Sequence, residues 1–319
     1  MPGVHVREDG SELVAEPISD HDVQRVITTL RSADRKIRLS LRRLEQLGRF
    51  DEESQLVQVG AGVKLNAVEE AANKVGLSLG PLSPGAMALS VGEFLEGPYA
   101  GLRAIPGGRL EPLSASLRVV TPDALVTESR AAPKSATGPE LDALHLGGRR
   151  RFGVIVGARL KLQPRPGAHQ RAVFSFPTAG ALTAALISSM QDGVVIASAA
   201  MDRRAERFVC TIQLLGNAES IERDLATVGR RALKEHGRPA SPTQASEGRG
   251  APIESLATWD ELRSGLEQGS AVVAFRLCVG GAIVKASKVG TALGGAVSSP
   301  LLDAIAASVD PDGVMKGLL

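Results

Sequence analysis

The stretch Leu141–Pro166, LDALHLGGRRRFGVIVGARLKLQPRP, decides how the chain divides into domains. From Val154 to Leu162 every second side chain is apolar, and Arg159 and Lys161 occupy two of the intervening positions. This alternation predicts a strand with one buried face. The two prolines at the end of the stretch cannot donate to a sheet ladder, so they predict a boundary near residue 166.

A glycine- and leucine-rich motif begins just before the stretch, at Gly138, and runs through it. The motif consists of a Gly-Gly turn, the segment Phe-Gly-Val-Ile, and a strand that ends in Leu-Lys-Leu-x-Pro-x-Pro. Its members are Gly138, Leu141, Leu144, Gly147, Gly148, Phe152, Gly153, Val154, Ile155, Leu160, Lys161, Leu162, Pro164 and Pro166. The motif resembles the closing segment of the FAD-binding domain of the FAD-linked oxidases. These are the vanillyl-alcohol-oxidase-like (PCMH-type) flavoproteins, which include the FAD-binding subunit of glycolate oxidase. The resemblance implies that the backbone of Gly153, Val154 and Ile155 lies against a flavin.

Other segments resemble the same family in the same order along the chain. Residues 81–92 resemble its second flavin-binding loop, residues 101–108 its glycine turn, and residues 310–315 its C-terminal Asp-Pro-x-Gly segment. If FAD binds, the resemblance therefore assigns the cofactor contacts to Pro84, Gly85, Val91, Gly92, Gly101, Arg103, Gly153, Val154 and Ile155.

Two segments depart from the family. Its working members have, after the first helix, a strand and a glycine-rich loop that holds the FAD pyrophosphate, whereas residues 31–50 contain one glycine, Gly48, and no histidine. A cradle of inward-facing amides usually needs positive φ angles and therefore glycines. Glu93 stands where the family has a glycine, and its carboxylate would repel a pyrophosphate. We therefore predict that FAD binding is weak or absent.

The segment that replaces the glycine-rich loop is strongly basic. Its candidate contact residues are Arg35, Lys36, Arg38, Arg42 and Arg43. They form either a solvated basic face or a site for an anion or an acidic protein partner.

Composition excludes several classes of protein. The chain has 319 residues, a formal net charge of +2, 43% hydrophobic residues and only 3% aromatic residues. So few aromatic side chains argue against base stacking with nucleic acid. No apolar run is long enough to span a membrane, and the first residues show no signal-peptide core. Cys210 and Cys278 lie in apolar runs and are expected to be buried thiols in a reducing, cytoplasmic setting.

Beyond residue 166 the pattern of elements changes. Strand-like and helix-like segments follow in the order strand–helix–strand–strand–helix–strand, with the last strand at 271–279, which is typical of a ferredoxin-like fold. We therefore expect an α+β protein with a PCMH-type FAD-binding domain over 1–166, truncated and built of two small α/β lobes (about 1–63 and 64–166). A ferredoxin-like cap follows over 167–319, with a mobile linker at 237–253 and a C-terminal tail.

Residues with catalytic chemistry are few. The five histidines have no metal-ligand spacing, so no metal is expected, and no Gly-x-Ser-x-Gly elbow occurs. His145, just before the Gly-Gly turn, and Arg276, inside an apolar run, are the catalytic candidates. Two functions remain possible. In the first, the protein is a scaffold, subunit or regulatory partner that has lost normal flavin binding and contacts a protein partner or its own copy. In the second, it is an active FAD-dependent oxidoreductase that resembles glycolate oxidase and acts on 2-hydroxy acids.

Overall fold

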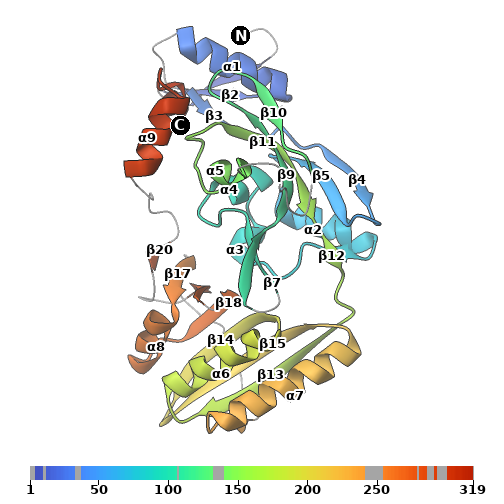
Figure 1. Cartoon of the computed structure of the whole chain (residues 1–319), viewed down its shortest axis with the longest axis vertical. Helices are drawn as coiled ribbons and strands as arrows, with labels where there is room; N and C mark the ends of the chain where they lie inside the picture. Colours follow the sequence, from blue (N-terminus) through green and yellow to red (C-terminus); the bar gives the residue numbers. More distant parts are fainter. Residues whose placement is uncertain are drawn as a thin grey trace.

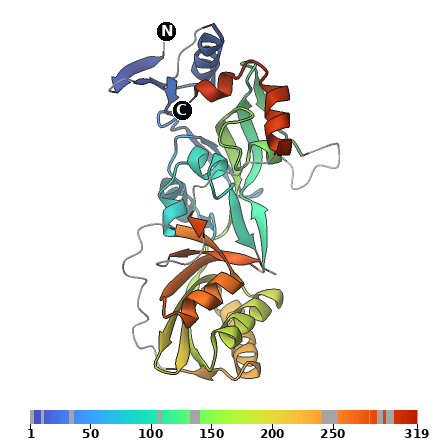
Figure 2. The same ribbon diagram turned by 90° about the vertical axis from the view of Figure 1, so that its left-hand side faces the viewer.

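The computed structural model describes residues 4–9, 12–32, 37–105, 108–131, 140–240, 254–278, 280–285, 291–292 and 300–318. The molecule is elongated, with a first lobe at one end, a second lobe in the middle and a cap at the other end (Figure 1). The mixed α+β class that the sequence predicts is confirmed. Figure 2 shows the two lobes stacked on the cap along the long axis.

The first lobe packs one helix on a small sheet. Ser19 caps the helix, because its hydroxyl oxygen accepts from the Asp22 amide (3.2 Å), and the apolar stripe from Val23 to Leu30 is buried. In the sheet, of order β1-β2-β3, β2 runs antiparallel to β1 and parallel to β3. The elements are β1 (His5–Asp9), β2 (Glu12–Glu16), α1 (Asp20–Ser32) and β3 (Ile37–Leu39).

The C-terminal tail, α9 (Pro300–Val309) and the 3-10 helix η1 (Val314–Gly317), returns to this lobe (Figure 1). The Asp310 carboxylate accepts from the backbone amides of Val314 and Met315 (2.9 Å each) and so fixes the turn into η1. Val314, Met315 and Leu318 then join the core of the first lobe. The sequence predicts that this tail belongs to the cap, whereas its apolar side chains are buried in the first lobe, at the opposite end of the molecule.

The second lobe is a five-stranded sheet of order β10-β9-β11-β5-β4 with helices on one face. Its strands are β4 (Leu47–Asp51), β5 (Leu56–Gly60), β9 (Ser114–Val120), β10 (Val126–Glu128) and β11 (Val154–Lys161). The helices are α2 (Leu65–Lys74), α3 (Pro84–Met87), α4 (Val91–Glu96) and α5 (Asp142–His145). Two small ladders complete it: β6 (Leu77–Ser78) with β12 (Gln163–Pro164), and β7 (Leu102–Ile105) with β8 (Arg109–Pro112). Because β4 and β5 already belong to this sheet, the change of lobe falls before residue 47 and not at 63.

Strand β11 departs from the simple alternation expected of it. A bulge lies between Ile155 and Gly157 in its pairing with β9. As a result Val154 and Val156 face the first-lobe core, whereas Ile155 and Leu160 both face the core of the second lobe. An extra residue in one strand shifts the following side chains to the other face. The start of β11 is therefore buried on both sides, between the lobes.

The cap sheet has the order β16-β13-β15-β14-β18-β19-β17-β20. Its elements are β13 (Ala168–Phe176), α6 (Ala179–Gln191), β14 (Ile196–Arg204), β15 (Arg207–Gly216), α7 (Ala218–Lys234), β16 (Arg238–Pro239), β17 (Glu254–Thr258), α8 (Trp259–Glu267), β18 (Val272–Cys278), β19 (Gly281–Lys285) and β20 (Thr291–Ala292).

The first four strands in the sheet order form the ferredoxin-like unit, but its fourth strand is not the one expected. That place belongs to the two-residue β16, and the expected strand at 271–279 is β18, which extends the sheet from β14 instead. Pro239 shortens β16 and removes its strand signal from the sequence. The expected linker begins with β16, and its residues 241–253 lie outside the described part.

Candidate functional site

A cleft of about 1090 Å³ lies between the two lobes. The first lobe contributes residues 38–42, from β3 and the turn after it, and Arg7 of β1. The second lobe contributes the starts of α3 and α4, with Pro84, Gly85 and Gly92 among the lining residues. Three of the residues assigned to the cofactor by sequence resemblance thus line one wall of a cleft of ligand size.

At the floor of the cleft, Glu96 at the end of α4 is buried, with 6% of its surface exposed. Its Oε1 accepts from the Ile155 backbone amide (2.7 Å), and its Oε2 accepts from Arg150 Nε (3.1 Å). Arg150 Nη1 also donates to the Leu39 carbonyl of β3 (2.9 Å). The amide that sequence resemblance places against a flavin is therefore bonded to a carboxylate, and one guanidinium joins the two lobes across the cleft.

The segment that carries Arg150 is held in an unusual backbone conformation. Arg149 and Arg150 have φ angles of +48° and +65°, a region that non-glycine residues rarely occupy. The amides of Gly147 and Arg149 donate to the carbonyls of Leu95 and Glu96, at the end of α4. Such conformations persist where the surroundings over-determine them, and here α4 fixes the segment so that Arg150 reaches Glu96.

Burial governs the chemistry of Glu96. Removal from water raises the pKa of its carboxyl group, and this outweighs the opposing effects of Arg150 and the Ile155 amide. Glu96 was not among the residues singled out from the sequence. In the sequence Glu96 follows the apolar pair Phe94-Leu95 and precedes Gly97-Pro98, at which α4 ends. Because both apolar residues are fully buried, this position was the available signal for a buried carboxylate.

Glu93, which was singled out, has a different role. Its carboxylate accepts from the Ser90 amide (2.7 Å) in a capping box at the start of α4, and lies 3.3 Å from Lys64 Nζ. Partial burial acts to raise its pKa, but the Ser90 hydrogen bonds and Lys64 together hold that pKa below its ordinary value. The carboxylate stays ionised on the cleft wall.

The glycine turn at Gly60–Gly62 offers no free amides to the cleft. Gly60 donates to the Gln46 carbonyl (2.7 Å), Ala61 to that of Val156 (3.0 Å), and Gly62 to that of Leu44 (3.0 Å). The turn after β3 packs so closely here that a Cβ on Gly62 would lie 2.3 Å from the Leu41 carbonyl oxygen. The amides of Val91 and Gly92 likewise donate to carbonyls of this loop, those of Val63 and Ala61.

The basic segment is divided by the fold. Arg38 and Arg42 line the cleft, whereas the exposed Arg43 does not. Arg42 Nη2 donates to Oε1 of the buried Glu16 (2.6 Å), which also accepts from Arg7 Nε (3.2 Å). Arg35 and Lys36 lie outside the described residues. The described part of the segment therefore does not form one continuous face.

The other candidate residues lie apart from the cleft wall. Arg103 is buried and bonded to Glu111 (2.8 and 3.0 Å) and to two backbone carbonyls, so it ties the β7–β8 hairpin to the second lobe. Gly101 adopts a φ of +62° beneath Leu95. The Nδ1 atom of His145 is buried and has no hydrogen-bond partner in the described structure, and burial lowers the pKa of this histidine.

Two more assigned positions are structural. Val154 is buried in the first-lobe core, and Gly153 has a φ of +143° with its Cα against β9. Arg276 lies in β18, and its side chain is outside the described part of the structure. The fold therefore does not bring the two catalytic candidates into one described constellation.

Comparison with known proteins identifies the fold and a match to an FAD binding domain. A family model of an FAD binding domain matches residues 26–129. A mitochondrial D-lactate dehydrogenase [cytochrome] of Arabidopsis thaliana is 36% identical over 118 residues, which are 36% of this chain and 20% of that protein. Residues 26–129 therefore match an FAD binding domain, and the chain is similar over more than a third of its length to D-lactate dehydrogenases.

A second relative has a similar name. A D-lactate dehydrogenase of Anaerostipes hadrus is 29% identical over 131 residues, 41% of this chain and 27% of that protein. The chain spans about a quarter of the length of the curated relatives that it matches.

Among solved structures, alkyldihydroxyacetonephosphate synthase superposes with a TM-score of 0.69 at 13% identity, covering 95% of this chain and 75% of that chain. p-Cresol methylhydroxylase superposes with a TM-score of 0.64 at 12% identity, covering 96% and 88%. The fold is therefore the PCMH-type FAD-binding fold with its cap.

The described residues of this chain were compared with two further kinds of feature, a metal site and a membrane-spanning helix. Within the described ranges, no three His, Cys, Asp or Glu residues are grouped so that they could hold a metal ion. Among the helices of those ranges, none has both the length and the apolar character to cross a bilayer.

Proposed function

We propose that this chain, which resembles the FAD-linked oxidases, is a non-catalytic scaffold or regulatory subunit, in which protein groups replace the flavin between the lobes. The observation that carries the proposal is the hydrogen bond from the Ile155 amide to Glu96 (2.7 Å). In the family this backbone lies against the flavin; here a buried, ion-paired carboxylate occupies its donor.

The cleft has room for FAD but its donors do not fit that cofactor. The seven residues between the end of β3 at Leu39 and the start of β4 at Leu47 contain no glycine, so β3 is not followed by a glycine-rich phosphate-binding loop. The amides of Val91 and Gly92 already donate inside the second lobe. Glu93 adds a negative charge on the same wall, which opposes a pyrophosphate.

Arg150 takes over one role that a ligand between two lobes performs. Its guanidinium links Glu96 of the second lobe to the Leu39 carbonyl of the first. A ligand that bridges two lobes stabilises their closed arrangement through such contacts. The bridge that Arg150 forms stabilises the closed arrangement of the lobes without a cofactor. The proposed protein therefore keeps its fold although it has lost flavin chemistry.

A flavin titration tests the proposal. The purified protein should lack the absorbance band of oxidised flavin, and added FAD should produce neither quenching of flavin fluorescence nor heat in calorimetry. The Glu96→Ala variant frees the Ile155 amide, so a gain of measurable FAD affinity in that variant alone supports the role given to Glu96. Stoichiometric FAD in the wild-type protein would overturn the proposal and favour an active FAD-dependent oxidoreductase, for which a 2-hydroxy acid such as glycolate or D-lactate is the first substrate to assay.

As a scaffold the protein needs a partner, either a different chain or its own copy. For an acidic partner we propose a contact with the exposed Arg43, which follows Arg42 of the cleft wall in the chain. Arg43→Glu should weaken capture of that partner, with Arg171→Glu, at an exposed position of β13 in the cap, as a matched control. Arg42 is less suitable for charge reversal, because a glutamate there would face Glu16. Unchanged capture by Arg43→Glu would remove this contact surface while leaving the flavin argument intact.

A further inference from the structure

A second hollow, of about 380 Å³, lies on the other face of the five-stranded sheet and shares no lining residue with the cleft. Val57 and Val59 of β5 pack into the helix-covered core, so Gln58 between them faces away from the helices, into the hollow. The hollow belongs neither to the proposed flavin region nor to the cap.

The sheet is shaped around this hollow. Lining residues come from all five strands, from Glu128 on β10 to Leu47 on β4. Two bulges border it, one at Val156 in β11 and one between Leu47 and Phe50 in β4. Bulges bend strands and are frequent beside binding sites. The start of α1 closes one end, where Asp20 enters the lining.

Charged groups of both signs alternate along the wall, and their donors are incompletely used. Arg118 pairs with Asp20, while its buried Nε has no hydrogen-bond partner in the described structure and lies 3.9 Å from Glu128. Arg159 Nη2 lies 3.5 Å from Glu128, too far for a strong hydrogen bond. Both arginine side chains are 41% exposed and so remain accessible to a ligand.

We propose that this hollow binds a small zwitterion, a free α-amino acid. Two arginines and two carboxylates give the wall no net charge, so the field does not favour a net anion or cation over a neutral molecule. The guanidinium groups of Arg159 and Arg118, whose side chains are each 41% exposed, suit a carboxylate, and Glu128 with Asp20 suits an ammonium group. A volume of about 380 Å³ is at the small end of ligand pockets and accommodates such a molecule.

The test is a thermal-shift screen of the full-length protein with each of the twenty common amino acids, followed by isothermal titration of any that stabilise it. At least one should bind with a stoichiometry of one, while its N-acetyl and carboxamide derivatives should bind much more weakly. Arg159→Gln and Glu128→Gln should each lower the affinity about tenfold or more, since each removes a charge-assisted contact. Arg171→Gln, an exposed arginine of β13 in the cap, should bind like wild type.

The proposal would be overturned if no amino acid bound at millimolar concentration, or if the affinity were undiminished in both hollow variants. Equal affinity for the blocked derivatives would overturn it as well, because a site for a zwitterion must lose affinity when either charge is removed. Should Arg159→Gln fold poorly, as judged by its melting temperature, Glu128→Gln decides the question, since that glutamate lies on the edge strand β10. None of these outcomes depends on whether FAD binds.

Discussion

Removal of Arg150 should destabilise the protein far more than loss of an ordinary surface cation. Arg150→Ala leaves the buried Glu96 carboxylate with the Ile155 amide as its remaining hydrogen-bond donor, and also removes the bond to the Leu39 carbonyl. Breaking a buried ion pair from one side costs about 3–5 kcal/mol. Because the Arg150 side chain keeps 23% of its exposure, we expect the lower end, about 3 kcal/mol.

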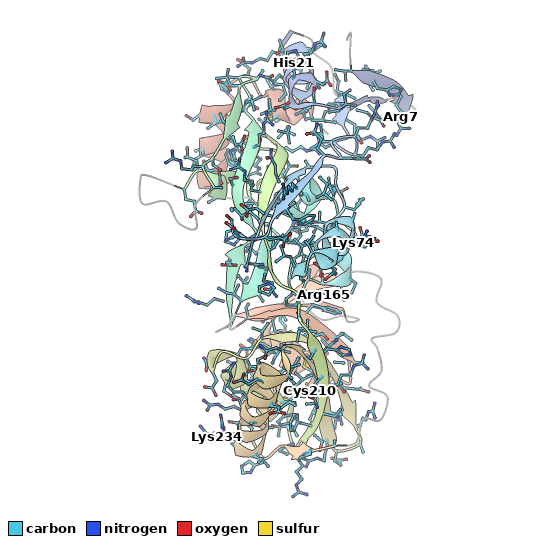
Figure 3. All side chains as sticks on the ribbon, turned by 90° about the vertical axis from the view of Figure 1, so that its right-hand side faces the viewer. Arg7, His21, Lys74, Arg165, Cys210 and Lys234 are labelled. Atoms are coloured by element: carbon cyan, nitrogen blue, oxygen red, sulfur yellow. The ribbon has the colours of Figure 1, made fainter. Side chains whose placement is uncertain are left out.

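The assay is urea unfolding of wild type, Arg150→Ala and Lys74→Ala, followed by thermal melting. Lys74 lies on the outside of the second lobe (Figure 3). Its side chain and that of its partner Glu70 are each more than 70% exposed, so replacement of Lys74 should cost at most about 0.5 kcal/mol. At roughly 2 °C per kcal/mol for a protein of this size, Arg150→Ala should lower the melting temperature by about 6 °C.

The penalty should also depend on pH. Burial raises the folded-state pKa of Glu96 above its ordinary 4.5, and loss of Arg150 raises that pKa further. A carboxyl group whose pKa is raised on folding favours the folded state less as pH rises from below 4.5 through the folded-state value. The Arg150→Ala penalty should therefore be larger at about pH 7 than at about pH 4.5. A cost equal to that of Lys74→Ala, or one independent of pH, would refute the buried bridge.

Other positions give separate tests. Asp310→Ala removes both acceptors at the turn into η1, should cost about 1–2 kcal/mol, and should speed proteolysis of the C-terminal tail; an unchanged cleavage rate would contradict this. Gly153→Ala should cost about 2 kcal/mol or more in urea unfolding, because φ is +143° and the new Cβ would lie 2.8 Å from the Val120 carbonyl oxygen; a neutral effect would mean that the backbone relaxes. Glu93 has a lowered pKa, so its contribution is present above about pH 4.5 and lost below; Glu93→Gln should therefore flatten the acid side of the stability profile. Burial raises the pKa of the Cys210 thiol, so mass spectrometry should find it alkylated only after unfolding.

Periodicity and turn chemistry predict much of the fold. The apolar stripe of α1 and the alternation in β15 are local patterns, and both elements form where those patterns lie. The order of domains also follows from local signals, since Pro164 and Pro166 end the second lobe before β13 begins. These features are predictable because each depends on residues close together in the chain.

Features that depend on long-range packing were not predictable in the same way. The two-residue β16 has no sequence pattern of its own and forms only because β13 offers an edge. The bulge in β11 leaves the apolar run unchanged while it redirects Val156 to the first lobe. Among the acidic residues of α4, Glu93 attracted attention by its place in a family motif, yet the buried carboxylate is Glu96, one turn later. Two residues separate them, and only the packing of β11 against α4 decides which one is enclosed.

The central proposal is that Glu96 and Arg150 occupy the place between the lobes that the resemblance to FAD-linked oxidases assigns to a flavin. The most direct measurement denatures the purified, FAD-supplemented and desalted protein and quantifies released flavin by chromatography. The account predicts no flavin above the level of a protein without an FAD-binding fold. One FAD released per chain would contradict it.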